Sequence, residues 1–115
     1  MNTYRLESRN PFNSSAVYNI LKDIITLECR GLVYDPNRCA ALVTTLSAKI
    51  RNKIKSLQFE RYRLVVFVEI GEKKLQGLQL VAKCLWDASK DNFATFTFQN
   101  TSLFVSATCF GIYQD

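Results

Sequence analysis

The chain has 115 residues and a mass of 13.2 kDa; 48% of its residues are hydrophobic and 22% are charged, as is typical of one globular domain. This composition excludes a disordered tail, a collagen-like repeat and a low-complexity linker. The net charge is +5 and histidine is absent, which removes the usual residue of general-base, catalytic-triad and zinc sites. The N-terminal segment MNTYRLESRN is polar and no apolar run approaches the length of a membrane span, so we expect a soluble intracellular protein with no signal peptide.

Two helices are predicted in the first part of the chain. Residues 1–12 show no clear period and are expected to form an extended arm before a domain over residues 13–115. The first helix begins after a possible N-cap at residues 13–15 and ends before Gly31, because apolar residues recur at helical spacing: Val17, Ile20, Leu21, Ile24 and Ile25. The second is predicted from Asp35 as N-cap and Pro36 as first helical residue to about Leu57.

Four strands follow, because apolar residues then alternate with a period of two. They are predicted at residues 62–70, 76–86, 93–98 and 103–113, with a turn over residues 71–74. Strands joined by short turns are expected to be neighbours in an antiparallel sheet, and two consecutive helices cover one of its faces. The predicted fold is therefore α+β, with two N-terminal helices packed on a four-stranded antiparallel sheet.

The second face of this sheet needs a separate cover. In the first strand, Val65 and Phe67 alternate with the core residues and therefore lie on the opposite side of the sheet. The last strand is apolar on both sides. One helix pair covers only one side, and an exposed apolar patch of this size usually marks an interface. A partner subunit is the simplest candidate for the cover.

No catalytic or cofactor-binding pattern is found. The four cysteines (Cys29, Cys39, Cys84 and Cys109) contain no CxxC pair and lie in apolar runs, so we expect reduced core thiols, with a disulfide between Cys29 and Cys39 as the alternative. The glycines are isolated, and the acidic residues fit helix faces, caps and turns. We therefore expect no cofactor, no metal and no enzyme activity, an enzyme with an unrecognised site being the remaining alternative.

The positive charge is uneven along the chain. Between Lys49 and Arg63 lie six basic residues and one acidic residue, Glu60. A solvated helix face followed by a strand edge is the favoured interpretation. The alternative is a basic β-sheet nucleic-acid-binding module whose strand aromatics stack bases: Phe93, Phe96, Phe98, Phe104 and Phe110. The order of helices and strands differs from that of the familiar sheet-based RNA binders, which makes nucleic acid the less favoured partner.

Short segments spread over nearly the whole chain resemble one family, the Tctex-type dynein light chains. They are TYRLE at residues 3–7, YDP at 34–36, RYRLVV at 61–66, IGE at 70–72, CLWD at 84–87, DNFA at 91–94, FQNTSLF at 98–104 and FGIY at 110–113. The YDP and CLWD segments are most similar to the branch that includes the axonemal outer-arm light chain. Phe59 and Glu60 depart from the family, where relatives often carry prolines.

The resemblance implies a non-catalytic subunit of a dynein motor. Family members form homodimers or heterodimers with another Tctex-type light chain by exchanging their second strand, here residues 76–86. The dimer binds a dynein intermediate chain, which adds a strand to a sheet edge, and the expected location is cytoplasm and cytoskeleton, in particular the axoneme of a cilium or flagellum. The implied dimer and partner-binding residues are Leu78, Gln79, Leu80, Val81, Ala82, Lys83, Cys84, Leu85 and Trp86; the sequence leaves open which face of this strand enters the partner core.

Overall fold

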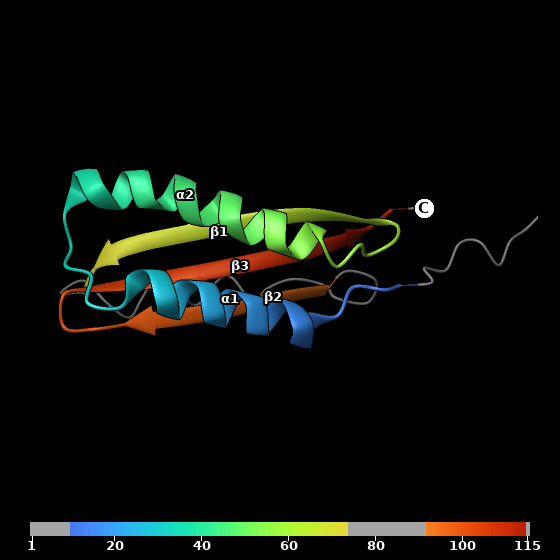
Figure 1. The fold of residues 1–115 in the computed structure, drawn as a ribbon, viewed down its shortest axis with the longest axis horizontal. Coiled ribbons are helices and arrows are strands. Elements are labelled where there is room, and N and C mark those ends of the chain that lie inside the picture. The colour runs from blue at the N-terminus through green and yellow to red at the C-terminus, as the bar shows by residue number, and fades with distance from the viewer. Residues whose placement is uncertain (1–9, 74–91, 115) are drawn as a thin grey trace, which may run out of the picture.

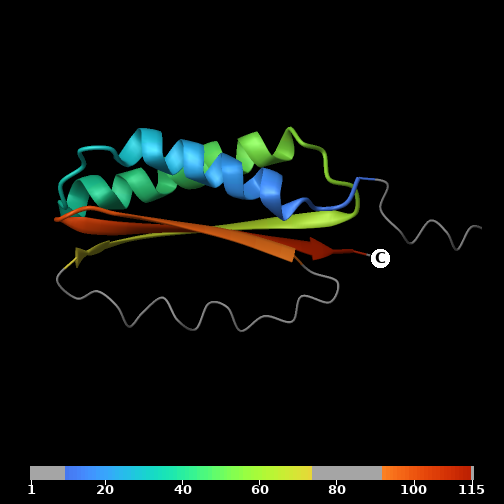
Figure 2. The ribbon, with the colours of Figure 1, turned by 90° about the horizontal axis from the view of Figure 1, so that it is seen from below.

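The computed structural model describes residues 10–73 and 92–114. They form two layers, a pair of helices lying on one face of an antiparallel sheet (Figures 1 and 2). The helices are α1 (Ser14–Cys29) and α2 (Pro36–Lys55), and the strands are β1 (Tyr62–Glu72), β2 (Asn92–Gln99) and β3 (Leu103–Tyr113). The α+β class and the order of two helices before the strands are confirmed.

Both helices begin at the predicted caps. Of the three candidates before α1, Asn13 is the N-cap, and its side-chain Oδ1 accepts a hydrogen bond from the backbone N–H of Ala16 at 3.1 Å. Asp35 caps α2 in the same way by accepting from the backbone N–H of Asn37 at 3.0 Å, and Pro36 is the first helical residue. Gly31 follows α1 with φ of 73°, a conformation that favours glycine.

The sheet has the strand order β1-β3-β2 within the described residues. The prediction that strands adjacent in the sequence are neighbours is confirmed for β2 and β3. For β1 it stays a prediction, because the predicted neighbour at residues 76–86 lies outside the described residues; β1 pairs over its whole length with β3, a pairing that the sequence did not predict. The two eleven-residue strands match in length and both place apolar residues under the helices. The predicted strand at residues 76–86 lies outside the described residues.

The turn predicted over residues 71–74 is partly wrong, because β1 continues through Gly71 and Glu72. Gly71 lies opposite Phe104 in the ladder, and a Cβ atom at this glycine would be 2.6 Å from the Cζ atom of the Phe104 ring. A glycine that makes room for a cross-strand ring thus belongs to a strand here and does not mark a turn.

The core lies between the helices and the sheet. Helix α1 covers β2 and α2 covers β1, so apolar stripes of both helices meet the inward residues of all three strands (Figure 2). The fully buried side chains of greatest volume are Leu21, Ile25, Leu46, Ile50, Ile54 and Leu103. Cys29, Cys39 and Cys109 are free and buried, so for these three the expected thiols are confirmed and the alternative Cys29–Cys39 disulfide is wrong; Cys84 lies outside the described residues.

The residues just before α1 contribute to this core. Phe12 is only 6% exposed, and its ring lies 5.2 Å from that of Phe59 and 5.9 Å from that of Tyr62, measured between centroids. Asn10 donates from Nδ2 to the backbone oxygens of Leu57 and Gln58, both at 2.9 Å. These contacts hold the connection between α2 and β1. A division of the chain into an arm and a domain after residue 12 stays a prediction.

Asn100 joins the two connections at the opposite end of the molecule. Its Nδ2 atom donates to the backbone oxygen of Leu32 at 2.9 Å, while Oδ1 accepts from the backbone N–H groups of Ser102 at 2.8 Å and Leu103 at 2.9 Å. The hydroxyl of Ser102 in turn accepts from the backbone N–H of Tyr34 at 2.8 Å. The segment between α1 and α2 is thereby fixed to the turn between β2 and β3.

Candidate interaction surfaces

The residues predicted for partner binding, Leu78 to Trp86, lie outside the described part of the chain, and their role stays a prediction. The surfaces on which a partner strand or subunit would act are nevertheless formed by β1, β2 and β3. They are the far face of the sheet and its two outer edges.

The far face of the sheet, which is turned away from both helices, is apolar at β1 (Figure 2). Val65 is 37% exposed and Phe67 is 49% exposed, although both are large hydrophobic residues. Val65 pairs with Phe110, which pairs with Phe93 on its other side, and the two phenylalanine rings lie 6.0 Å apart. This row of apolar side chains is the feature that a second subunit would cover.

The middle of the far face is polar but satisfied. Ser106 and Thr108 of the central strand are each 2% exposed, and the hydroxyls of Thr95 and Thr108 lie 2.9 Å apart as a hydrogen-bonded pair. Thr95 also donates to the backbone oxygen of Ala107 at 3.2 Å. Ser106 and Thr108 are therefore not part of the exposed surface, and the buried hydroxyl of Thr108 has its hydrogen-bond partner in Thr95.

The hydrogen bonds at the ends of β1 show which of its residues direct their backbone groups to the outer edge of the sheet. The backbone N–H of Gln114 donates to the oxygen of Arg61, and the N–H of Lys73 donates to the oxygen of Ser102, both in the register of the β1–β3 ladder. Backbone groups alternate in direction along an antiparallel strand, so odd-numbered residues of β1 face β3. The even-numbered residues, such as Leu64 and Val66, direct their N–H and C=O groups to the outer edge.

The same argument applies to β2 with the opposite parity. Asn100 donates its backbone N–H to the oxygen of Leu103 at 3.0 Å, in register with the β2–β3 ladder. The odd-numbered residues Phe93, Thr95 and Thr97 therefore direct their backbone groups outwards. Within residues 10–73 and 92–114, β1 and β2 are the two edge strands, and an edge strand is able to take a further strand.

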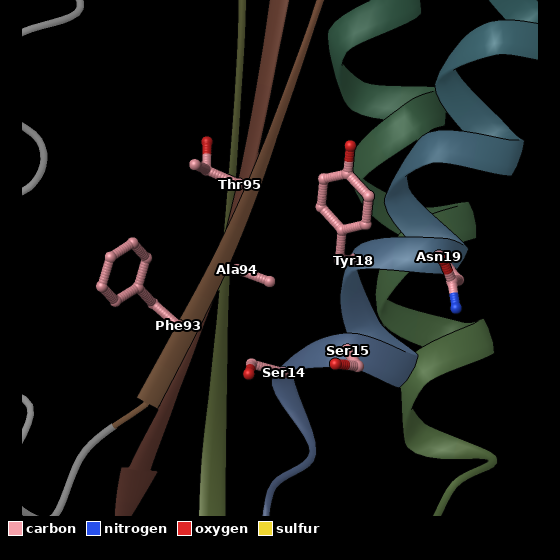
Figure 3. A pocket seen from close by; sticks show the side chains of 7 residues that line it. All are labelled: Ser14, Ser15, Tyr18, Asn19, Phe93, Ala94 and Thr95. Carbon is pink, nitrogen blue, oxygen red and sulfur yellow. The ribbon is translucent and has the colours of Figure 1, made fainter.

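A hollow of about 420 Å³ lies beside the β2 edge. Figure 3 shows Tyr18 and Asn19 on α1 and, across the hollow, Ala94 turned toward the helix and Phe93 and Thr95 turned away from it. Ser14 and Ser15 complete its lining. The Tyr18 ring is 40% exposed and meets Phe96 edge to face at 5.8 Å. A side chain of a strand added to this edge would have space here.

The five phenylalanines on which the nucleic-acid alternative depends do not form a row of exposed rings. Phe96 and Phe98 pack against the core between sheet and helices, and Phe104 is buried at 7% exposure. Phe104 shares the far face with Phe93 and Phe110 but is buried, and the rings of Phe93 and Phe110 contact each other. Stacking of successive bases needs a row of exposed rings, so the structure does not favour this alternative.

The buried thiols are not suited to nucleophilic chemistry. Burial, with smaller contributions from Glu28 and Cys39, raises the pKa of Cys29 to about 11. Burial raises the pKa of Cys109 to about 12, although the nearby Arg51 acts in the opposite direction. The thiolate is the reactive form, so both groups are inert at neutral pH. No group of metal-ligating side chains is found among the described residues, and none of the helices in that part is long and apolar enough to cross a membrane.

Together, these observations define a two-layer α+β domain with a helix pair on one face of the sheet, an apolar row on the other, and two edge strands within the described residues. The model of the Tctex-1 family matches residues 11–112, and the chain belongs to this family. It is 36% identical over 112 residues to the dynein light chain Tctex-type 5 of Homo sapiens, covering 97% of this chain and 63% of that protein. With the dynein light chain Tctex-type 5-B of Xenopus laevis the identity is 33% over 114 residues, covering 99% and 65%.

The resemblance inferred from the short segments is thereby confirmed at the level of the family. A third relative, the dynein light chain Tctex-type protein 2B of Danio rerio, is 34% identical over 114 residues, which are 97% of this chain and 76% of the relative. The chain spans just under two thirds of the length of the Tctex-type 5 relatives. Similarity to the axonemal outer-arm branch in particular stays a prediction.

Proposed function

We propose that this chain is a non-catalytic dynein light chain that supports motor assembly and microtubule-based movement. The match to the Tctex-1 family over residues 11–112 carries this proposal, together with relatives that are named dynein light chains. A subunit of this kind acts by holding other chains together, which requires surfaces for association and no reactive group.

The first association is with a second light chain, either another copy or a related Tctex-type chain. In the proposed dimer, residues 76–86 are exchanged into the sheet of the partner, as the family resemblance implies. The exposed Val65 and Phe67 on the far face support a dimer, because burying them against a second subunit would remove apolar surface from water.

The second association is with a dynein intermediate chain, a segment of which adds to a sheet edge as a further strand. Outward backbone groups supply affinity that depends little on sequence, while pockets for alternate side chains select the segment. A dimer offers two equivalent sites, so two intermediate chains are brought together with an effective concentration of about millimolar for the second contact. The proposed location is the cytoskeleton, within a dynein complex of the cytoplasm or the axoneme.

Sedimentation equilibrium at micromolar concentration tests the dimer. For a homodimer we expect twice the chain mass, and a species of 13.2 kDa at all concentrations would contradict the homodimer and leave a related light chain as the partner. Leu80→Asp or Val81→Asp is expected to reduce dimerisation or peptide binding, depending on the face each residue occupies, because a buried unpaired charge costs several kcal/mol. Leu27→Asp is the matched control, since Leu27 is 68% exposed on α1.

Calorimetric titration with fragments of dynein intermediate chains tests the second association. We expect one fragment per light chain and a β-sheet signal that increases in the complex. No binding by any fragment to a chain that is shown to be dimeric would contradict the role in motor assembly while leaving the dimer intact.

A further inference from the structure

The net charge of the chain is concentrated in one short segment. Residues 49–63 contain six of the fifteen basic residues and one of the ten acidic residues, which gives +5. The other 100 residues carry nine basic and nine acidic side chains and are neutral as a whole. The net positive charge of the chain therefore lies in this segment, and the remaining residues carry no net negative charge that would offset its field.

The last part of α2 arranges four of these cations around an outer row of small residues. At 100° per residue, Lys49 and Lys53 lie on one side of the helix, and Arg51 and Lys55 lie on the other. All four are exposed, whereas Ile50 and Ile54 point into the core. The outward direction between the two pairs carries Ala48 and Asn52. A narrow partner segment can thus lie along the helix between two lines of positive charge.

One further cation, Arg61, lies beside this surface just before the start of β1. Helix α2 ends beside the beginning of β1 (Figure 1), where Arg61 is partly exposed. Arg63 is exposed but shares the parity of Val65 and Phe67, so it lies on the far face of the sheet and outside this surface. Asn10 holds the connection between α2 and β1. Its side chain donates hydrogen bonds to the backbone oxygens of Leu57 and Gln58, and its backbone oxygen accepts from the backbone N–H of Glu60 at 3.0 Å. The spacing of the charges is therefore fixed by the fold before any partner arrives.

Ordinary structural roles explain only some of these charges. Lys53 and Lys55 lie in the last turn of α2, where cations offset the helix macrodipole. Lys49 forms an ion pair with Glu28 of α1 at 2.5 Å. Neither role accounts for Arg51. Moreover, α2 contains no acidic residue, although a mixture of acidic and basic residues would keep the helix surface equally soluble.

We propose that the surface formed by Lys49, Arg51, Lys53 and Lys55, the basic corner, is a docking site for an acidic segment of a partner protein. Carboxylates spaced about one helical turn apart would meet both lines of charge. Nucleic acid fits less well, because the rings at this end contact one another: Phe12 with Phe59 and Tyr62, and Tyr62 with Tyr113. They are thus not available to stack on bases. The site is separate from strand addition and does not rest on the proposed dynein role.

Fluorescence anisotropy with a labelled octaglutamate peptide tests the docking site. The test variant is Lys53→Glu with Lys55→Glu, and the control is Lys22→Glu with Arg30→Glu, which changes the net charge equally at exposed positions of α1 and its end. We expect at least about a tenfold loss of affinity in the test variant and less than about twofold in the control, with a steep dependence on salt. Circular dichroism confirms that both variants are folded.

Carbodiimide coupling supplies a second readout, because it joins a lysine amine directly to a carboxylate of the bound peptide. We expect peptide adducts at Lys49, Lys53 and Lys55 in preference to Lys22. Equal loss of affinity in the test and control variants, or adducts spread evenly over the lysines, would show a general charge effect and overturn the proposal. Tighter binding of a labelled single-stranded RNA than of the peptide, lost in the same test variant, would overturn it in favour of nucleic acid.

Discussion

The contact between Phe12 and Gly111 gives a sharp test of how the segment before α1 is joined to the sheet. Phe12 is 6% exposed in an aromatic cluster, so Phe12→Ala is expected to lower the free energy of unfolding by about 3–5 kcal/mol. Domains of this size have about 5–15 kcal/mol in all, and the melting temperature should fall by at least about 10 °C. Leu27→Ala, at a site that is 68% exposed, should change the stability by less than about 0.5 kcal/mol.

Gly111 makes this prediction specific to the contact. A Cβ atom at Gly111 would lie 2.7 Å from the Cγ and Cε2 atoms of Phe12, so Gly111→Ala should cost about 1–3 kcal/mol in the wild-type chain. In the Phe12→Ala background the ring is gone, and the same substitution should cost little. The expected coupling free energy is about 1–3 kcal/mol.

Urea denaturation of the four proteins, at one fixed protein concentration, measures this coupling. Gly71→Ala is the matched control, because its clash is with Phe104 at the other end of the β1–β3 pair. Its cost should add to that of Phe12→Ala within about 0.5 kcal/mol. An equal cost of Gly111→Ala in both backgrounds would refute the packing of Phe12 on Gly111.

Three further predictions concern a hydrogen-bond network, two thiols and one ion pair. Asn100→Ala should cost about 2–3 kcal/mol in urea denaturation, because it removes one donor and one acceptor that together make three hydrogen bonds; Asn100→Asp, which keeps the acceptor, should cost less. The pKa values of about 11 for Cys29 and 12 for Cys109, against 9.0 when unfolded, mean that unfolded thiols release protons first. Stability should therefore fall as the pH rises above 9, and Cys109→Ala should make the fall shallower. Lys49→Ala should change the free energy of unfolding by less than about 1 kcal/mol, since the Lys49 and Glu28 side chains are 50% and 27% exposed.

Local signals in the sequence were sufficient for the helices and for the last strand. Asp35 and Pro36 fix the start of α2 because the cap bond and the ring conformation involve only neighbouring residues. The predicted last strand agrees with the bounds of β3, Leu103–Tyr113. Such features depend on interactions within a few residues, which a pattern of side chains records directly.

Strand pairing was the part that local signals could not supply. The β3 partner of β1 is separated from it by more than thirty positions in the sequence, and the alternation of β1 does not indicate which distant strand lies beside it. What selects β3 is the fit of two long strands under both helices, a property of the assembled core. Of the strands predicted, the one at residues 76–86 is outside the described part of the chain and its pairing is not yet tested.

The burial of Phe12 had a signal that the sequence interpretation missed. Phe12 directly precedes the N-cap Asn13, and Val17 is the fourth residue of α1, which is the spacing of a hydrophobic staple. Both residues belong to the buried cluster. A hydrophobic staple uses only one residue on each side of the N-cap, here Phe12 and Val17, and therefore produces no repeating pattern. The periodicity of residues 1–12 could not reveal it.

Amide hydrogen exchange can locate the edge at which a partner strand adds. In the isolated chain at low concentration, the outward amides of Leu64 and Val66 should exchange faster than that of Val65, which is directed to β3. Addition of a strand to β1 would slow Leu64 and Val66 and leave Val65 unchanged. Addition at β2 would instead slow the outward amides of Phe93 and Thr95. A lack of alternation in the isolated chain would contradict the assigned directions, whereas slowing of both parities on association would indicate general stabilisation of the sheet and no added strand at either edge.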